Sequence, residues 1–328
     1  MKPRPLRTAI PFCIVSLILT VLASTMSLTY AQYTAYDLGP GYAYGINDAG
    51  TVVGYSGRWG GGVFTYSGGV MTQLSPTLGE AYGINDAGTI VGVTLNGGQA
   101  FSYSGGVIAL LGSGCAYAIN NAGTIVGIAN GSQAFSYNGG VTTLLGSGCA
   151  YAINNVGTIV GYAAATGQAF SYSGGHMTDI ALGAPCYAYG VNDVGTTVGI
   201  ANGSQAFSYS GGVMTDLGTL GGTISHALAI NSAGTIVGDS ATSGNEASHA
   251  FVYSGGHMMD LAPYLSSIGL TQNTYAEAIN DNGDIVGYGT TALGGEQDAF
   301  LLVVPEPNCF AMFGLSLAGL VLLRRRQR

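Results

Sequence analysis

The chain has 328 residues, of which 56 are glycine and 21 tyrosine, and only 7% of its residues are charged. This length suits one large β domain, and the glycine content predicts many tight turns. The formal net charge is −8, and seven of the eight basic residues lie near the two ends, so Arg58 is the single basic residue of an acidic body. Such a body cannot neutralise phosphate groups, which excludes nucleic acid and disfavours anionic lipid surfaces as partners.

Residues 1–31 have the pattern of a secretory signal peptide. Basic residues within the first seven positions precede an apolar stretch over residues 10–22. Thr29-Tyr30-Ala31 then places small residues at positions −3 and −1, which predicts cleavage before Gln32. The alternative is an uncleaved anchor. In both cases the body is expected outside the cytoplasm, in an oxidising space.

Residues 32–304 repeat one pattern seven times. Each copy contains an Asn that is followed by Gly after three and again after seven residues, and the Asn residues are Asn47, Asn85, Asn120, Asn154, Asn192, Asn231 and Asn280. A second phrase contains Phe and, in six copies, continues into Tyr-Ser-Gly-Gly or Tyr-Asn-Gly-Gly. An Asn that opens a four-residue turn closed by Gly is typical of a β-hairpin, and Gly-Gly indicates a second hairpin.

Four short strands are therefore predicted in each repeat. The first strand alternates small and large residues, and the third places Phe101 and Tyr103 opposite Ala100 and Ser102. We expect the aromatic face of one copy to pack on the small-residue face of the next. The repeats are spaced 34 to 49 residues apart, in the range of propeller blades. The predicted fold is all-β, a seven-bladed β-propeller of four-stranded repeats.

The two ends of the body complement one another. The last repeat stops after Ala299-Phe300-Leu301-Leu302 and lacks a fourth strand. Near the start, Asp37-Leu38-Gly39 matches Asp216-Leu217-Gly218 in the fourth strand of the fifth repeat. We therefore expect the N-terminal strand to complete the last repeat and close the ring, which would remove an open sheet edge.

Length varies in only two of the four connectors of each repeat, between the second and third strands and between the fourth strand and the next repeat. In an antiparallel repeat these connectors share one face, and the two fixed turns share the other. Variable loops on a rigid scaffold commonly bind ligands, which makes the longest, residues 262–275, the first choice for a binding loop. The alternative is drift in unconstrained loops.

Carboxylates follow the repeat Asn in four copies, as Asp48, Asp86, Asp193 and Asp281, and would surround the fixed-turn face. A cation could bridge them. The series is interrupted by Asn121, Asn155 and Ser232, so solvated turn residues are the favoured interpretation. The stretch over residues 280–284 is the most calcium-like loop, but its Gly is misplaced for an EF-hand.

Cys115 and Cys149 occupy equivalent positions in adjacent repeats, each five residues before the Asn. A disulfide between them requires Cα atoms about 4.4–6.8 Å apart. The alternative is that both are small apolar side chains that fill space near the centre of the fold.

No catalytic constellation is evident in the sequence. His176 and His257 hold a position that is Val in four other repeats, and His226 and His249 lack the spacing of metal ligands. There is no nucleophile elbow and no phosphate-binding loop. We therefore expect no catalytic residue, no cofactor and no metal site.

Residues 305–328 combine three features. Pro305-Glu306-Pro307 precedes an apolar run over residues 310–323, and Arg324, Arg325 and Arg326 follow. The run predicts a transmembrane helix with the arginines on the cytoplasmic side. This arrangement resembles a PEP-CTERM sorting signal. The resemblance implies recognition by an exosortase, a membrane-embedded processing enzyme of bacteria that make extracellular polysaccharide, and a location at the cell surface or outside the cell after transient anchoring.

The repeats of residues 33–303 also resemble the HAF-type repeats of exported bacterial proteins. Six repeats contain the Ala-Phe pair, but only Ser248-His249-Ala250-Phe251 includes the His. The resemblance implies no catalytic activity.

These observations favour a noncatalytic surface or secreted protein that binds, or helps to build, the extracellular polysaccharide matrix. The rival hypothesis is a polysaccharide hydrolase or lyase, which would require carboxylates to converge in a pocket, such as Asp239, Glu246, Glu296 and Asp298. A purely architectural protein without a ligand is the third hypothesis.

Overall fold

The structure is a computed structural model that describes residues 33–305 apart from residues 58–60, 76–77, 96–97, 181–184 and 293–294. The predicted signal peptide lies outside the described residues. The same is true of the sorting tail after Pro305, including Glu306, Pro307, the predicted transmembrane helix and the Arg cluster. Within the described part of the chain, no helix is both long enough and apolar enough to cross a membrane. Residues Thr34–Val304 form one compact unit.

Two tight turns organise each repeat, and glycine makes both of them possible. In the first turn, the N–H of Gly50 donates to the carbonyl of Asn47 at 2.9 Å, and the equivalent bond recurs in all seven repeats. Gly50 has a φ of 75°, which glycine adopts without a Cβ clash. In the second turn, Gly68 and Gly69 have φ values of 58° and 83°. Two successive positive φ angles define a type I′ turn, whose twist suits a two-residue hairpin.

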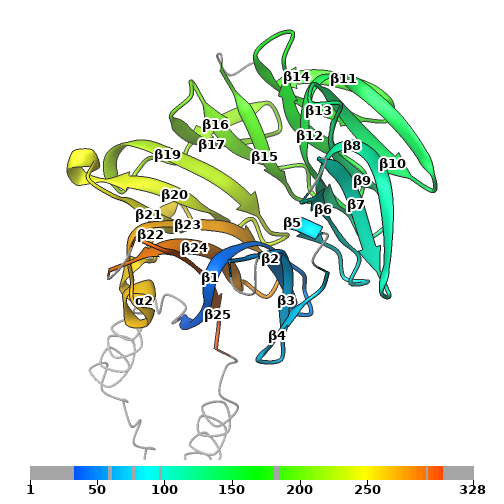
Figure 1. Cartoon of the computed structure of the whole chain (residues 1–328). Coiled ribbons are helices and arrows are strands. Elements are labelled where there is room, and N and C mark those ends of the chain that lie inside the picture. The colour runs from blue at the N-terminus through cyan, green and yellow to red at the C-terminus, as the bar shows by residue number, and fades with distance from the viewer. Residues whose placement is uncertain are drawn as a thin grey trace, which may run out of the picture. The chain divides into compact units, whose positions relative to one another are not determined.

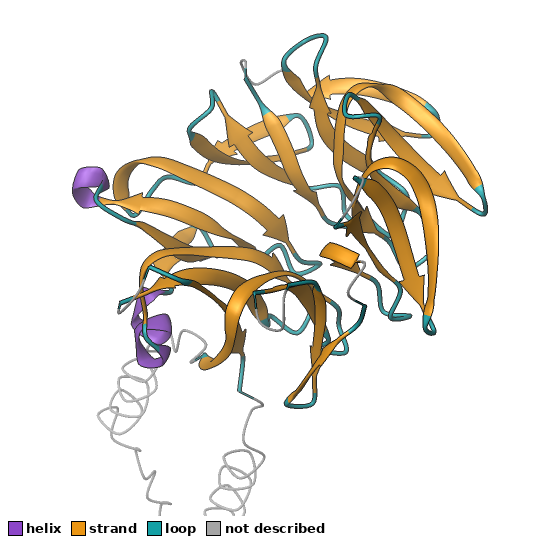
Figure 2. Ribbon diagram, viewed as in Figure 1, coloured by secondary structure: helices purple, strands orange, loops and turns teal. Residues whose placement is uncertain are grey.

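The described strands form four antiparallel sheets (Figures 1 and 2). The first has seven strands, in the order β23 (Leu270–Ile279), β24 (Ile285–Thr291), β25 (Gln297–Val303), β1 (Thr34–Ile46), β2 (Val52–Ser56), β3 (Val63–Ser67) and β4 (Val70–Gln73). The second has ten strands, in the order β14 (His176–Ile180), β13 (Gln168–Ser173), β12 (Ile159–Ala163), β11 (Val141–Ile153), β10 (Gln133–Asn138), β9 (Ile125–Ala129), β8 (Val107–Ile119), β7 (Gln99–Ser104), β6 (Ile90–Thr94) and β5 (Leu78–Ile84).

The remaining two sheets have four strands each and correspond to single repeats. The third sheet consists of β15 (Tyr187–Val191), β16 (Thr197–Ala201), β17 (Gln205–Ser210) and β18 (Val213–Asp216). The fourth consists of β19 (Gly221–Ile230), β20 (Ile236–Thr242), β21 (Ser248–Ser254) and β22 (His257–Asp260). The short helical segments are η2 (Ser243–Asn245), α2 (Ala262–Leu265) and η3 (Ser266–Ile268).

The prediction of a seven-bladed propeller is wrong. The described strands form sheets of seven, ten, four and four strands instead of seven separate four-stranded blades, and none of these sheets closes on itself. The reason is that the 13-residue strands β1, β8 and β11 each run through a boundary between repeats. The first half of β8 pairs with β7 and its second half pairs with β9. Gly112 and Gly114 at this boundary have φ values of 109° and 136°, so the strand changes direction without ending.

The N-terminal strand joins the two ends of the described chain. β1 pairs antiparallel with β25, with Asp37 opposite Phe300, and its C-terminal part pairs with β2. This is the pairing that the match of Asp37-Leu38-Gly39 to the fifth repeat predicts. The last repeat therefore receives its fourth strand from the beginning of the body, although the sheet so formed stays open.

The core consists of contacts between successive repeats. The Phe of the third strand is almost fully buried in every repeat. Phe101 packs with Val53 and Val63 of the preceding repeat, and Phe207 packs with Val160 and Ala169. Packing of an aromatic ring on a small-residue face is seen for Phe207 and Ala169, although the partner is the preceding repeat and not the next one. Phe64 of the first repeat shares a cluster with Val286 and Ala299 of the last repeat.

The Gly in the second strand of each repeat is required because the backbone of the neighbouring strand lies very close to it. A Cβ on Gly199 would lie 1.9 Å from the carbonyl oxygen of Tyr187 in the adjacent strand, which is far inside van der Waals contact. The pairing of β15 with β16 shifts register between Ala188 and Gly190, as in a β-bulge. Glycine thus allows the first two strands of a repeat to come together at the bulge.

Candidate functional site

The first strand of every repeat contributes to two cavities. One is lined by the ends of these strands and the turns that follow them, and the other by side chains three positions before each repeat Asn. In both cavities all seven repeats contribute, through β1, β5, β8, β11, β15, β19 and β23 or the turns that follow them.

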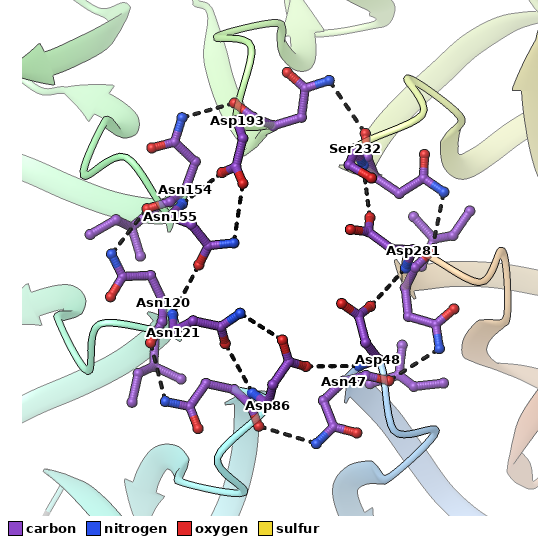
Figure 3. Close-up of a pocket in the computed structure, with 18 of the residues that line it drawn as sticks. Asn47, Asp48, Asp86, Asn120, Asn121, Asn154, Asn155, Asp193, Ser232 and Asp281 are labelled. Atoms are coloured by element: carbon purple, nitrogen blue, oxygen red, sulfur yellow. Dashed lines mark hydrogen bonds between the residues drawn. The ribbon is translucent and has the colours of Figure 1, made fainter.

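The first cavity has a volume of about 180 Å³ and is surrounded by asparagine side chains (Figure 3). The Nδ2 of each repeat Asn donates to the backbone carbonyl of the repeat Asn that follows, at distances between 2.8 and 3.3 Å. The seventh bond runs from Asn280 to the carbonyl of Asn47, so the series returns to its start. The Oδ1 of Asn154 also accepts the N–H of Thr158 at 2.7 Å, and this second bond recurs in each repeat.

A second tier of bonds uses the residue after the Asn. The N–H of Asp48 donates to Oδ1 of Asp86 at 3.0 Å, and the N–H of Asp281 donates to Oδ1 of Asp48 at 2.9 Å. Burial raises the pKa of Asp48, and the nearby charges of Asp86 and Asp281 add to this rise, although a backbone hydrogen bond opposes it. The four carboxylates are exposed, as expected for solvated turn residues. They also join neighbouring repeats, which the turn interpretation does not include.

This polar cavity is best explained as a clasp between repeats, by which we mean the ring of hydrogen bonds that joins the seven repeat Asn residues. Its Asn side chains are buried and their hydrogen bonds are made within the protein. In the part of the chain that the structure describes, no group of three or more His, Cys, Asp or Glu residues is placed to hold a metal ion. A buried amide is costly unless it is hydrogen-bonded, so the bonds between successive Asn residues stabilise the contact between repeats.

Replacement of Asn154 by Ala should test this clasp. The change removes the donor to the buried Asn192 carbonyl and the acceptor of the Thr158 N–H. We expect the free energy of unfolding to fall by about 2–4 kcal/mol, because each abandoned partner costs about 1–3 kcal/mol. Chemical denaturation measures this change. Asn155→Ala, which alters an exposed residue of the same turn, is the control and should cost less than half as much.

The second cavity, of about 160 Å³, is lined mainly by tyrosine rings. Its wall consists of Tyr44, Tyr82, Tyr117, Tyr151, Tyr189, Leu228 and Glu277. Successive rings of the five tyrosines are tilted against one another, with centroids 5.0 to 5.7 Å apart. Such tilted contacts are favourable for aromatic pairs. Each of the five side chains is only partly buried, so the rings remain available to a ligand.

Glu277 is the one acidic side chain that lines this cavity. It takes the position that Tyr holds in the first five repeats and Leu228 holds in the sixth. Burial raises its pKa to about 7, and the charge of Asp239 contributes. No hydrogen bond to another described residue stabilises its charged form. Removing a charged carboxylate from water without a partner costs free energy, which favours its neutral form.

The hydroxyls of several tyrosines are engaged by the side chain two residues earlier in the same strand. Tyr82 donates to Oε2 of Glu80 at 2.5 Å. The thiols of Cys115 and Cys149 hydrogen-bond to Tyr117 and Tyr151, while burial raises the pKa of both thiols. Burial likewise raises the pKa of Tyr189 to about 12. The tyrosines therefore remain neutral across the physiological pH range.

The described cysteines are all free thiols. The Cys115–Cys149 disulfide is thus not formed in this structure, and each thiol is instead paired with the tyrosine of its own strand.

His226 is paired with Asp239, whose charge acts on Glu277 of the tyrosine cavity. Nδ1 of His226 lies 3.1 Å from Oδ1 of Asp239, and the hydroxyl of Ser248 donates to Oδ2 of Asp239 at 2.6 Å. The hydrogen bond to Asp239 raises the pKa of His226. The carboxylate lies between the other two groups, so these residues do not have the Ser-His-Asp order of a hydrolase triad.

A pH series should reveal the raised pKa of the partly buried Glu277. Below its usual pKa of 4.5, Glu277 is protonated in both folded and unfolded protein. Between 4.5 and about 7 only the unfolded chain ionises, so stability decreases as pH rises. Between pH 4 and pH 8 the free energy of unfolding of Glu277→Gln should rise by about 2–3 kcal/mol relative to that of wild type. Denaturation at each pH measures this difference. Glu296→Gln, an exposed site, should show no such gain; parallel curves for wild type and Glu277→Gln would contradict the prediction.

The carboxylates proposed for the rival enzyme do not meet in either cavity. Glu246 and Glu296 are exposed, and Asp239 is held by His226 and Ser248. Asp298, on β25, does not line the two cavities. No pair of these four carboxylates converges in either cavity, so the condition set for a hydrolase or lyase is not met there.

The loop expected to bind, residues 262–275, is folded into the body. It forms α2, η3 and the start of β23, and its Leu265 and Leu270 are buried. His249, within the Ser-His-Ala-Phe sequence, bonds through Nδ1 to Oδ2 of Asp260 at 2.8 Å. His176 and His257 are exposed on their strands, as their equivalence to Val predicts.

Sequence reasoning missed Glu277. The signal was present, because the phrase Ala-Tyr-Gly-Ile-Asn becomes Ala-Glu-Ala-Ile-Asn in the last repeat. The importance of the substitution emerges only when the seven equivalent positions are seen to line one cavity. A search against protein-family models finds no match to this chain, and a search of curated proteins likewise finds none.

Proposed function

We propose that the protein is an exported, noncatalytic component of the extracellular matrix or cell surface that binds carbohydrate in its tyrosine cavity. The observation that carries this proposal is the arc of five partly exposed tyrosine rings. Tyrosine combines a flat apolar face with a polar hydroxyl, which suits a sugar ring with its apolar C–H face and polar edge. Convergent aromatic side chains with few polar groups are typical of ligand sites.

The size of the cavity limits what enters it. Pockets for drug-sized ligands occupy about 300–1,000 Å³, whereas this cavity has about 160 Å³. It therefore accommodates one sugar unit or a pendant group, and the rest of a polymer would remain outside. This fits a protein that holds a polysaccharide at an end or at a side group.

Export and sorting complete the proposal and rest on the sequence alone. The signal-peptide pattern of residues 1–31 supports secretion, and the PEP-CTERM-like tail of residues 305–328 supports recognition by an exosortase. The repeats and the tail resemble those of exported bacterial proteins. Intact-mass measurement of the protein from cells with and without an exosortase tests this part, since an identical C-terminus in both would contradict it.

Carbohydrate binding is tested with the purified full-length chain on a glycan array. Tyr151→Leu should weaken binding at least tenfold, because it removes one ring from the cavity wall. Leu is compatible with the fold at this position, since Leu228 holds it in the sixth repeat. Tyr36→Leu, at an exposed tyrosine that does not line the cavity, is the matched control. Equal binding by both variants and wild type would refute the assignment of the site.

A further inference from the structure

We infer that the tyrosine cavity recognises an alkylammonium group, so that the carbohydrate it binds carries free amino groups rather than acidic ones. The inference rests on the proposed function for the source of the ligand. Recognition of an ammonium group does not depend on which molecule carries it, because it follows from one carboxylate and five aromatic rings that share a cavity.

Among the described residues, none is paired as a counter-charge with the carboxylate of Glu277. It lines the cavity, and no described residue donates a hydrogen bond to it. Every Lys and Arg of the chain lies outside the described residues, so none of these can be placed beside it. Asp239, whose charge acts on Glu277, is paired with His226. A ligand that brings its own positive charge would satisfy Glu277, since buried charges in proteins are normally paired.

The tyrosine rings favour the same ligand. The face of an aromatic ring carries negative electrostatic potential and attracts an ammonium group within about 6 Å of the ring centre. Aromatic cages that bind organic cations are built from several rings, here Tyr44, Tyr82, Tyr117, Tyr151 and Tyr189. Because burial keeps these phenols neutral, their rings contribute attraction without a competing proton transfer.

The surrounding charges select against an acidic ligand. Glu80 adjoins Tyr82, and the charge of Asp239 reaches Glu277. A uronate or sulfate group would meet these carboxylates without a Lys or Arg among the described residues to offset the repulsion. A protonated amine would instead be attracted by Glu277 and by the tyrosine rings, which offset the cost of its desolvation. An amino sugar without its acetyl group presents such an amine on a ring small enough for the cavity.

Isothermal titration of the full-length chain with three probes tests the inference. The probes are a glucosamine hexamer, the N-acetylglucosamine hexamer and choline chloride. We expect the glucosamine hexamer to bind at least tenfold more tightly than its acetylated counterpart. Glu277→Gln should lose at least about 30-fold in affinity for it, because one partner of a desolvated charge pair is removed. Glu246→Gln, an equivalent change at an exposed position, should bind as wild type does.

The outcomes separate the inference from the proposed function. Equal binding of both hexamers, unaffected by Glu277→Gln, would overturn the ammonium site and leave carbohydrate binding standing. Choline binding that depends on Glu277, without binding of either hexamer, would support the ammonium site and overturn the carbohydrate function. Absence of binding by all three probes would overturn both. Retained cooperative unfolding of Glu277→Gln at pH 7 shows that lost affinity does not reflect lost folding.

Discussion

Removal of residues 33–39 should destabilise the whole described body and not only its N-terminal edge. These residues supply the part of β1 that pairs with β25, including Asp37 opposite Phe300. They also supply Leu38, which is 6% exposed and belongs to the cluster shared by the first and last repeats. Loss of a buried Leu alone costs about 2–5 kcal/mol. We expect the truncation to lower the free energy of unfolding by at least about 3 kcal/mol, which corresponds to a decrease of roughly 6–12 °C in unfolding temperature.

Calorimetry of the truncated and intact bodies measures this effect. The transition should remain cooperative but move to lower temperature, because the clasp of asparagines couples every repeat to the next. Tyr36→Ala, a change at an exposed side chain of the same strand, is the control and should shift stability by no more than about 0.5 kcal/mol. An unchanged transition after truncation would mean that the pairing with β25 contributes nothing to the stability of the body.

Replacement of Phe207 by Ala should cost about 3–5 kcal/mol. The ring is fully buried and packs with Val160, Ala169 and Ile180 of the preceding repeat. The cavity left behind cannot collapse easily, because its walls belong to two sheets with fixed backbones. Urea denaturation gives the change in the free energy of unfolding. The lost contacts lie between repeats, so folding of the whole body, and not of one sheet, is weakened.

Val213→Ala provides the matched control for this change. Val213 starts the strand that pairs with that of Phe207, but its side chain is 66% exposed. Its replacement should alter stability by no more than about 0.5 kcal/mol. A loss below about 1 kcal/mol for Phe207→Ala would show that the aromatic face does not form the contact between repeats.

The sequence predicts the local structure of this protein well, and for identifiable reasons. Asn47 and Gly50 predict a turn because Gly tolerates the positive φ that closes it, and Gly68-Gly69 predicts the second hairpin in the same way. The alternation of Phe101 with Ala100 predicts a strand with a large-residue face and a small-residue face, and both residues are buried in the structure. Such properties depend on steric and hydrophobic preferences of a few neighbouring residues, which the sequence states directly.

The sequence predicts the candidate site less well. The length of the connector favours residues 262–275 as a binding loop, whereas in the structure its Leu265 and Leu270 are buried in the core. The sequence does not single out Glu277, because one Glu in a strand predicts no site by itself. Its environment depends on residues that are far away in the sequence, including Tyr44 and Asp239.

The sequence by itself determined the seven repeats, their turns, the large and small faces of the third strand and the strand that links the two ends of the body. Only the tertiary structure decided how the strands divide into sheets, because β8 and β11 continue through boundaries that look like turns in the sequence. It also decided that five tyrosines and Glu277 share one cavity. The physical reason is range: turns and alternation arise from contacts between near neighbours, whereas strand continuity and cavity lining depend on the packing of distant repeats.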